Sequence, residues 1–507
     1  MKRTTQQFMT GLALFGLISL SSCKKDDTPG MEQKGPDIEF LVLDNGNKLV
    51  RFNASSPKMP ISTVSLTGLQ EGETVLAIDF RPATGQLYAL SSTSRLLVID
   101  EKSGNTRAIG AGSFTPALSS GVAGFDFNPT VDRIRIVTSN GQNLRAHPET
   151  GAIVATDGVI NGVTNAMVTG VAYTDSKAGT STTTLFDIDT QTDMLYKQDP
   201  PNNGTLVAVG SLMTDITGEI GFDISADNKA SLFVATTGGK STLYQVDLAT
   251  GKATNIGDLM GVTNAKGLAI PTEPVAYAIN SGTNLLIFNP MSPMPVTKAI
   301  TGMQPGETIL GIDFRPANGA LYALGSTSRL YTLNTASGAA TGVGTLTFTT
   351  LLSGTYFGFD FNPTVDRIRV VSNTGQNLRL NPNDGSLAAT DGALNPGNPS
   401  ISAAAYTNNF AGATTTILYD IDCGTDKLYR QDPPNNGTLV EVGAIGINIE
   451  SSNGFDIGSQ SGKAWAVLTA GGTTKLYEIN LNTGAATAVG NYSFSGPVDG
   501  FSVGLGF

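Results

Sequence analysis

The sequence predicts an all-β fold, a β-propeller of about ten four-stranded blades, and three observations lead to it. First, the chain is duplicated, because the string GFDFNPTVDRIR at 124–135 returns unchanged at 358–369. Second, short runs of alternating apolar and polar residues recur in groups of four, separated by turn residues. Third, Gly accounts for 60 of 507 residues and charged residues for only 14%, which suits tight turns better than helices. We expect very little helix.

The duplication covers nearly the whole chain after an N-terminal leader. A second string, QDPPNNGTLV, occurs at 198–207 and again at 431–440, so two copies of nearly equal length follow head to tail. A long internal period of this kind indicates an array of similar units rather than two unrelated domains. We place the first propeller repeat at 38–273 and the second at 274–507.

Each copy is built from shorter units. The clearest one, at 124–158, contains the runs GFDF, RIRIVTS, NLRAHP and AIVATDG, separated by the turns NPTVD, NGQ and ETG. Four-stranded units that repeat without interruption are typical of propeller blades. A β-sandwich would not repeat its strand pattern ten times, and a β-helix would need shorter coils.

The number of rings depends on how the ends pair. The first unit, which starts at Ile38, lacks a leading strand, and 499–507 is a leading strand without a unit. Pairing these two ends would close one ring, which the short join at 271–274 favours. Segment 266–271 reads either as the leading strand of the next unit or as the strand that closes the first copy. Because most propellers have about four to eight blades, we predict two five-bladed propellers in tandem, with one ten-bladed ring as the alternative.

The N-terminus reads as an export signal. Lys2 and Arg3 precede an apolar run at 9–20 that is too short to span a bilayer. The next letters, LSSC ending at Cys23, resemble a bacterial lipobox. The resemblance implies a signal peptide at 1–22 and acylation of Cys23, with 23–37 as a lipid-anchored flexible tether. The alternative is an ordinary cleavage site in which Cys23 has no special role.

The predicted location is the cell envelope, as an outer membrane lipoprotein held to the membrane through acylated Cys23. The letters after Cys23, KKDD at 24–27, are similar to the surface-export signal of some Gram-negative lipoproteins, which would expose the protein on the cell surface. The alternative is that 24–27 is simply a solvated part of the tether.

Composition excludes several function classes. The net charge is −11 and no cluster of Lys and Arg follows the tether, so we expect no nucleic-acid partner. The single histidine, His147, corresponds to Asn381 in the second copy, so neither a histidine-based catalytic triad nor a multi-histidine zinc site forms within one chain. Paired carboxylates for glycoside hydrolysis stay open, because acids are plentiful and their separations are unknown from sequence.

The leading strands carry an acid in three of the five units of each copy. Leading strands lie nearest the axis of a propeller, so we expect these acids to gather around the central opening, where they would hold a cation or a polar ligand. The alternative is that they pair with backbone groups between blades. The six acids are Asp79, Asp126, Asp223, Asp313, Asp360 and Asp456.

The unchanged strings supply further polar candidates. We expect Asp126 to lie opposite Arg133 or Arg135 on the neighbouring strand, and the repeated string GQNLR adds an arginine on the strand after it. An acid among several guanidinium groups would bind a carboxylate or a sugar hydroxyl. The alternative is an ion network that locks adjacent blades. The candidate ligand-binding residues are Asn128, Arg133, Arg135 and Arg145, repeated as Asn362, Arg367, Arg369 and Arg379.

Two more segments attract notice. Asp187, Asp189 and Asp193 have a spacing that suggests calcium, although the Gly and the terminal Glu of an EF-hand loop are absent; the alternative is a solvated strand face. The string QDPPNNG reads as a rigid exposed turn, which is either a contact site or plain turn chemistry. Its candidate residues are Gln198 and Asp199, repeated as Gln431 and Asp432.

Together, the segments IDFRPATG, GFDFNPTVDRIR, GQNLR and QDPPNNGTL resemble the bacterial DUF4394 family, in two copies over nearly all of 38–507. The resemblance implies a propeller-like exported protein of undefined activity and supplies no catalytic residues. We predict a binding module for a glycan or a protein partner, with no cofactor unless calcium binds. The alternatives are a polysaccharide-acting hydrolase or lyase that uses propeller carboxylates, and a structural envelope protein.

Overall fold

The computed structural model describes residues 34–345, 347–450 and 453–507, and the regular secondary structure of these ranges consists almost entirely of short β-strands. They contain strands β1 to β40, two short 3-10 helices (η1, Pro201–Asn203, and η2, Pro434–Asn436) and no α-helix. The strands form ten four-stranded antiparallel sheets, each of which is a blade. The prediction of an all-β propeller with about ten blades is therefore confirmed. None of the helices in these ranges is long or apolar enough to cross a bilayer.

Blades 1 to 5 form the first ring. In each blade the innermost strand is followed outward by three antiparallel neighbours. From inside to outside the strands are β20 (Ala265–Ala269), β1 (Glu39–Asp44), β2 (Lys48–Asn53) and β3 (Ser62–Ser65) in blade 1; β4 (Val75–Phe80), β5 (Leu87–Ser91), β6 (Leu96–Ile99) and β7 (Thr106–Ile109) in blade 2; β8 (Ala123–Asn128), β9 (Arg133–Thr138), β10 (Asn143–Ala146) and β11 (Ile153–Thr156) in blade 3; β12 (Val168–Tyr173), β13 (Leu185–Asp189), β14 (Met194–Gln198) and β15 (Leu206–Ser211) in blade 4; and β16 (Ile220–Ile224), β17 (Ser231–Thr237), β18 (Lys240–Val246) and β19 (Ala253–Asp258) in blade 5.

Blades 6 to 10 form the second ring in the same way. Their strands, again from inside to outside, are β40 (Val498–Val503), β21 (Ala276–Asn280), β22 (Asn284–Phe288) and β23 (Val296–Ala299); β24 (Ile309–Phe314), β25 (Leu321–Gly325), β26 (Arg329–Leu333) and β27 (Ala340–Val343); β28 (Phe357–Asn362), β29 (Arg367–Ser372), β30 (Asn377–Leu380) and β31 (Leu387–Thr390); β32 (Ile401–Tyr406), β33 (Leu418–Asp422), β34 (Lys427–Gln431) and β35 (Leu439–Ala444); and β36 (Asn453–Ile457), β37 (Ala464–Ala470), β38 (Thr473–Ile479) and β39 (Ala486–Ala488).

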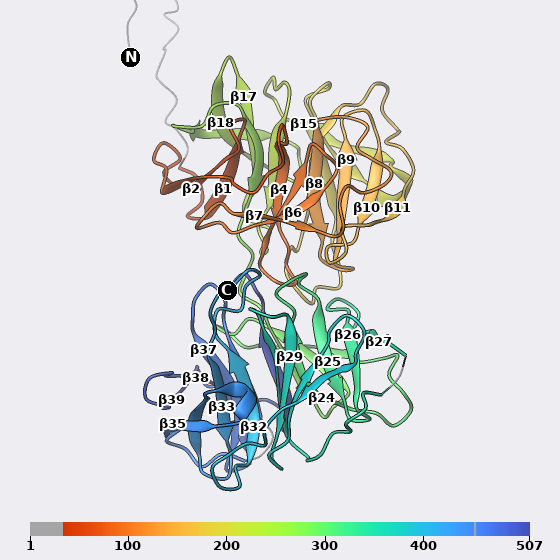
Figure 1. The fold of residues 1–507 in the computed structure, drawn as a ribbon. Helices are drawn as coiled ribbons and strands as arrows, with labels where there is room; N and C mark the ends of the chain where they lie inside the picture. The colour runs from red at the N-terminus through yellow and green to blue at the C-terminus, as the bar shows by residue number, and fades with distance from the viewer. Residues whose placement is uncertain (1–33, 346, 451–452) are drawn as a thin grey trace, which may run out of the picture. The chain divides into compact units, whose positions relative to one another are not determined.

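Each ring closes on itself through its last strand. β20 pairs with β1, with Ala269 opposite Leu41, and β40 pairs with β21, with Ser502 opposite Tyr277. Contacts between inner strands then run around each ring, through β20, β4, β8, β12 and β16 in the first and through β40, β24, β28, β32 and β36 in the second. In Figure 1 the first ring runs from red to green and the second from green to blue. The ten-bladed alternative is therefore wrong, and 266–271 closes the first copy rather than leading the next unit.

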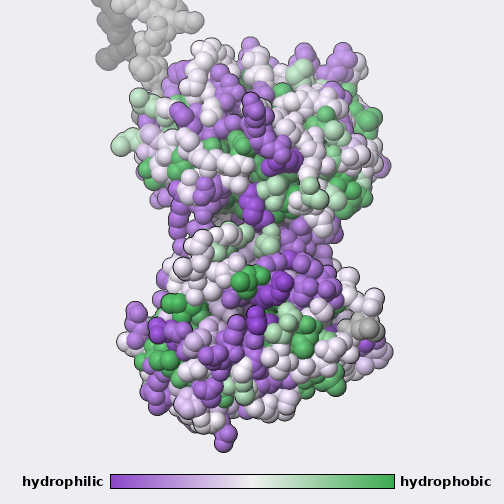
Figure 2. Space-filling model, viewed as in Figure 1, coloured by the Kyte–Doolittle hydropathy of each residue, from purple (hydrophilic) through white to green (hydrophobic). Residues whose placement is uncertain are grey.

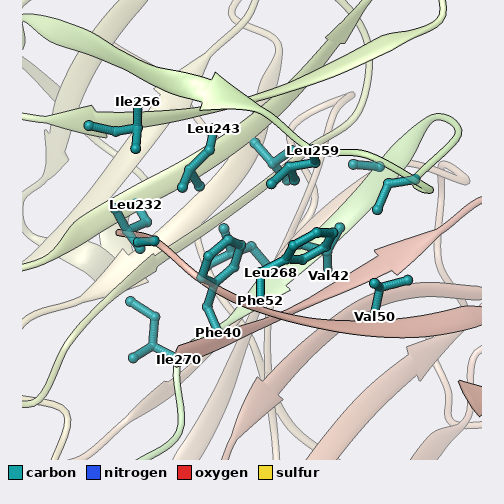
Figure 3. Packing of buried hydrophobic residues seen from close by; sticks show 14 of the residues in the cluster. Phe40, Val42, Val50, Phe52, Leu232, Leu243, Ile256, Leu259, Leu268 and Ile270 are labelled. Atoms are coloured by element: carbon teal, nitrogen blue, oxygen red, sulfur yellow. The ribbon is translucent and has the colours of Figure 1, made fainter. Parts of the chain in front are cut away.

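The hydrophobic core lies between neighbouring blades. Where blade 5 faces blade 1, Leu232 and Leu243 pack with Phe40 and Phe52, and all four side chains are fully buried (Figure 3). Because successive side chains of a strand point to opposite faces, Leu41 of β1 packs in a different cluster, which lies between blades 1 and 2. Burial of a side chain of this size contributes about 1.5–3 kcal/mol. Every blade is thus held on both faces by apolar contacts.

The inner strands approach one another too closely for large side chains. A Cβ added at Gly221 of β16 would lie 2.1 Å from the backbone N of Leu268, and one added at Gly124 of β8 would lie 2.8 Å from the backbone N of Val171. Crowding at the axis therefore selects small residues. All ten inner strands have Gly or Ala at this position, which we call the small position: Ala77, Gly124, Gly170, Gly221, Gly267, Gly311, Gly358, Ala403, Gly454 and Gly500.

Candidate functional site

Each ring has a triad of buried aspartates at its axis. Two residues after the small position, the five inner strands place Asp, Asp, Ala, Asp and Ala in the first ring and Asp, Asp, Ala, Asp and Ser in the second. In each triad, one carboxylate oxygen from each aspartate lies within 4.8 Å of the other two. The first triad is Asp79, Asp126 and Asp223, on β4, β8 and β16, and the second triad is Asp313, Asp360 and Asp456, on β24, β28 and β36.

A backbone hydrogen bond from the next blade fixes each triad aspartate. The N–H of Phe127 on β8 donates to Asp79 at 2.8 Å, and the N–H of Ile270 donates to Asp223 at 2.6 Å. The triads therefore link neighbouring blades, which is the backbone role considered for these acids, and they also converge at the axis. The corresponding donors to Asp126, Asp313, Asp360 and Asp456 are the N–H groups of Tyr173, Phe361, Tyr406 and Val503.

The triads concentrate negative charge that their hydrogen-bond partners do not balance. Burial raises the pKa of Asp223 to about 7 and that of Asp456 to about 7, against the effect of their backbone hydrogen bonds. Burial, together with repulsion from fellow triad members, raises the pKa of the other four aspartates well above its ordinary value. Carboxylates this close cannot all stay ionised unless a cation joins them, and otherwise some of them hold protons.

The two triads differ in their nearest neighbour. In the second ring, Ser502 Oγ lies 2.9 Å from Asp313 Oδ1 and 3.1 Å from Asp456 Oδ2, whereas the first ring has Ala269 at this place. Asp360 also has one oxygen to spare: its Oδ1 accepts from the next blade, but its Oδ2 is buried without a hydrogen-bond partner. Buried oxygens normally have a partner, and Asp360 Oδ2 has no hydrogen-bond donor among the described residues.

Arg135, the arginine of the unchanged string, joins blades 3 and 4. It stands opposite Asp126 in the strand register, but its N–H groups point to other partners. It donates to Asn143 Oδ1 at 2.7 Å and Asp157 Oδ2 at 2.6 Å, and to Asn202 Oδ1 in the next blade at 2.8 Å. We call this set the inter-blade network. Arg369 makes the same contacts in the second ring, with Asn377, Asp391 and Asn435. Arg135 and Arg369 thus link adjacent blades, which is the alternative considered for them, and these hydrogen bonds do not go to Asp126 or Asp360.

Asp157 is the centre of the network, and the sequence patterns did not single it out. Arg145 holds it with two parallel hydrogen bonds, from Nε at 2.8 Å and from Nη2 at 3.0 Å. Arg379 holds Asp391 in the same way. A signal was present, because TDG occurs at 156–158 and again at 390–392. It follows the outermost strand of a blade, however, and nothing in the strand pattern brings it to the arginines.

The remaining candidates support turns or face solvent. Asn128 Oδ1 accepts from the backbone of its own turn, and Arg133 donates to the carbonyl of the residue before it. Gln198 Nε2 donates to the carbonyl of Pro201 at 2.5 Å, and Asp199 is exposed. The counterparts Asn362, Arg367, Gln431 and Asp432 are placed alike.

The acids with calcium-like spacing do not converge. Asp187 and Asp189 are fully buried, so the solvated strand face considered for them is wrong. Asp189 accepts from the backbone N–H of Met167, and Asp193 accepts from that of Ile216. Both oxygens of Asp187 are buried and have no hydrogen-bond partner among the described residues, and burial raises its pKa well above the ordinary value although Arg135 lies near.

A family model agrees with the two-ring architecture. The model described as a domain of unknown function, DUF4394, matches residues 48–269 and 284–502, one match in each ring. The chain belongs to this family. The two matches confirm the tandem copies, and each DUF4394 copy corresponds to one five-bladed ring. No curated protein matches the chain.

Several solved structures are similar to this DUF4394 protein at low identity. The extracellular domain of BT4673 from B. thetaiotaomicron is 10% identical over 90% of this chain and 65% of that one, with a TM-score of 0.26. PorZ, a surface component of the type-IX secretion system of Porphyromonas gingivalis, is 13% identical over 88% of this chain and 57% of that one, with a TM-score of 0.24. The Dos1 propeller is 14% identical over 64% of this chain and 82% of that one, with a TM-score of 0.24. The chain covers less than two thirds of the first two, and likenesses at these TM-scores do not bear on function.

The predicted signal peptide at 1–22, the predicted lipidation site at Cys23 and most of the predicted tether lie outside the described residues, which begin at Lys34.

Proposed function

We propose that this DUF4394 protein is an exported, lipid-anchored module that binds a glycan or a protein partner and does not catalyse a reaction. The observation that carries the proposal is the loop at 198–204, repeated at 431–437. Asn202 and Asn203 are exposed at its tip. The inter-blade network fixes the loop, because Arg135 donates to the side chain of Asn202 and Asn143 donates to the backbone carbonyl of Pro201. Polar groups in a fixed conformation bind a partner at a low cost in conformational entropy.

The chemistry of the loop suits a polar partner. Its tip offers exposed amides beside the carboxylate of Asp199, and the half-buried Arg145 lies next to Asp157 in the same network. Amide, carboxylate and guanidinium groups recognise sugar hydroxyls and polar peptide surfaces through directed hydrogen bonds. Figure 2 shows hydrophilic residues spread over much of the visible face of both rings, which also favours a polar partner.

Burial of the triads argues against the enzyme alternative. A glycosidase needs two carboxyl groups on either side of an accessible glycosidic bond. Asp79, Asp126 and Asp223 converge, but each is at most 3% exposed and each accepts from the backbone of the next blade. A polysaccharide chain cannot reach them without separating the inner strands.

Duplication of the loop supports binding through two contacts. The second ring repeats the first loop with the same hydrogen bonds, from Arg369 to Asn435 and from Asn377 to the carbonyl of Pro434. Two weak sites on one chain bind a repeating partner more tightly than either site alone, provided that both engage. A polysaccharide is such a partner.

The proposal is tested with the full chain, purified in detergent and applied to an array of cell-wall and plant polysaccharides. We expect binding to at least one of them, and a marked loss in the variant Asn203→Ala with Asn436→Ala, because both side chains are exposed at the loop tips. Asn482→Ala, which changes an exposed asparagine in another turn, serves as the control and should bind normally.

Unchanged binding in the double variant would rule out the loops as the site. If no polysaccharide binds, a photoreactive residue at position 203 tests for a protein partner by cross-linking on intact cells. The absence of any cross-linked protein would then contradict the proposal.

A further inference from the structure

We propose that each axial triad is a binding site for one divalent cation, and that the cation is calcium rather than magnesium. The inference is independent of the surface loops. It begins with the geometry: three aspartates from three different blades bring one oxygen each to within 4.8 Å of the others, in both rings.

A second observation points to a ligand. Asp360 is 1% exposed, and its Oδ2 has no hydrogen-bond partner. Its Oδ1 is already fixed by the N–H of Tyr406, so the carboxylate cannot turn away without losing that hydrogen bond. The free oxygen therefore stays buried on a triad residue, where an uncompensated polar atom is costly unless something binds it.

The charge of the site favours a cation. The hydrogen bonds to the two triads come from backbone N–H groups and, in the second ring, from Ser502; among the described residues none comes from Lys or Arg. Three carboxylates that share a buried space repel one another, and a divalent cation removes most of that repulsion.

The rigidity of the triad favours calcium. The three oxygens lie no more than 4.8 Å apart, so a cation at their centre would lie at most roughly 2.8 Å from each of them, which is within reach of a divalent ion. Calcium takes oxygen ligands at about 2.3–2.6 Å in flexible geometry, whereas magnesium demands about 2.0–2.1 Å and an octahedral arrangement. Backbone hydrogen bonds from the next blades fix the triad carboxylates, so they cannot rearrange into an ideal octahedron and suit the ion that accepts flexible geometry.

The second ring also offers a small space and an extra ligand. A pocket of about 10 Å³ is lined by all five inner strands of that ring at positions just before the triad, including Gly311, Gly358 and Gly454. Ser502 Oγ adds a neutral oxygen beside Asp313 and Asp456, while the first ring has Ala269. We expect the second triad to bind the cation more tightly than the first.

The test counts bound metal in the full chain, purified in detergent. The protein is stripped with EDTA and equilibrated with about 1 mM free calcium, the upper range for extracellular calcium modules, and the retained metal is measured by mass spectrometry. We expect two calcium ions per chain, one in Asp126→Asn, one in Asp360→Asn and none in the double variant. The control Asp384→Asn, at an exposed turn, should keep both.

Calorimetry on the unaltered chain and on Ser502→Ala provides a second test that does not remove a triad member. The unaltered chain should show two calcium affinities, and Ser502→Ala should weaken only the tighter one. Absence of calcium binding, retention of two ions in the double aspartate variant, or magnesium affinity equal to that for calcium would each overturn the proposal.

Discussion

The guanidinium of Arg135 on β9 donates from Nη2 to Oδ1 of Asn202, 2.8 Å away in the loop of the next blade. This contact explains why two strings far apart in the sequence are unchanged between the copies. GFDFNPTVDRIR supplies the buried arginine and QDPPNNG supplies one of its acceptors, so a change of Asn202 would leave an N–H group of Arg135 without that partner. The same pair recurs as Arg369 and Asn435.

Replacement of Arg135 by lysine should destabilise the first ring. Lysine keeps the charge but has no planar fork, so it cannot serve Asn143, Asp157 and Asn202 together. Each partner left unpaired costs about 1–3 kcal/mol, and we expect a loss of about 2–4 kcal/mol in the free energy of unfolding, measured in urea. Arg133→Lys is the control: within the described part of the chain Arg133 donates only to backbone carbonyls, and its replacement should change stability by less than about 0.5 kcal/mol. Equal effects of the two changes would contradict the network.

Asp391 should matter as much as the arginines it binds. It accepts from Arg369 at 2.6 Å and from Arg379 at 2.8 Å, and these contacts hold its pKa below the ordinary value although burial opposes them. Asp391→Asn leaves the buried Arg369 without a counter-charge. Loss of one partner of a buried pair costs about 3–5 kcal/mol; because Arg379 is partly exposed, we expect about 2–4 kcal/mol. Asp384→Asn, at an exposed position of the same blade, should have little effect in the same urea titration.

Crowding at the axis makes a different prediction. Gly221→Ala adds a methyl group 2.1 Å from the backbone N of Leu268, and backbone cannot move aside as a flexible side chain would. Overpacking of this kind costs about 1–3 kcal/mol or more. Gly121→Ala is the matched control, because a Cβ there meets nothing within 4 Å. A melting temperature that falls for Gly221→Ala and not for Gly121→Ala would support the close approach of β16 and β20, whereas equal melting temperatures would contradict it.

The fold could be predicted from the sequence because it is repetitive. Alternation along each strand and the turns between strands define the blade, and duplication multiplies that evidence. Which strands close each ring was harder to predict from the sequence. The segment 266–271 has the pattern of a leading strand in either arrangement, and only its pairing with β1 decides between one ring and two.

The candidate site was predicted only in part. Acids on leading strands converge at the axis because inner strands surround it, and the strand pattern contains that information. The partners of Arg135 were not accessible, because Asp157 and Asn202 reach it from a loop and from the next blade, and no periodicity reports contacts of that kind. Burial of Asp187 was missed for a related reason: β13 has blades on both sides, so neither of its faces is solvated.

Lipidation of Cys23 gives a prediction outside the rings. The resemblance of LSSC to a lipobox implies that the thiol of Cys23 is acylated, so cells that express the protein should incorporate labelled palmitate into it. Cys23→Ser should abolish the label, and Cys423→Ser should not, because Cys423 lies at the end of β33 within blade 9. Label retained in Cys23→Ser would exclude a lipoprotein anchored at this residue.

Asp420 gives the protein a pH dependence that can be isolated by one substitution. Both its oxygens are buried and find no hydrogen-bond partner in the part of the chain that the structure describes, and burial raises its pKa to about 8 although Arg369 lowers it. The folded pKa exceeds the ordinary value, so the proton is bound more tightly in the folded state. The contribution of Asp420 to stability is therefore complete below about pH 4 and is lost as the pH rises to about 8, by about 1.4 kcal/mol per pH unit. The side chain of Asp420→Asn stays neutral. The free energy of unfolding of this variant, measured in urea titrations, should therefore rise relative to that of the unaltered protein as the pH rises from 5 to 8. The triads are common to both proteins, so their titration cancels in the difference. Asp432→Asn, at an exposed position, is the control and should show no such gain. If the difference in stability between Asp420→Asn and the unaltered protein does not change with pH, position 420 does not hold a buried, unpaired carboxyl group.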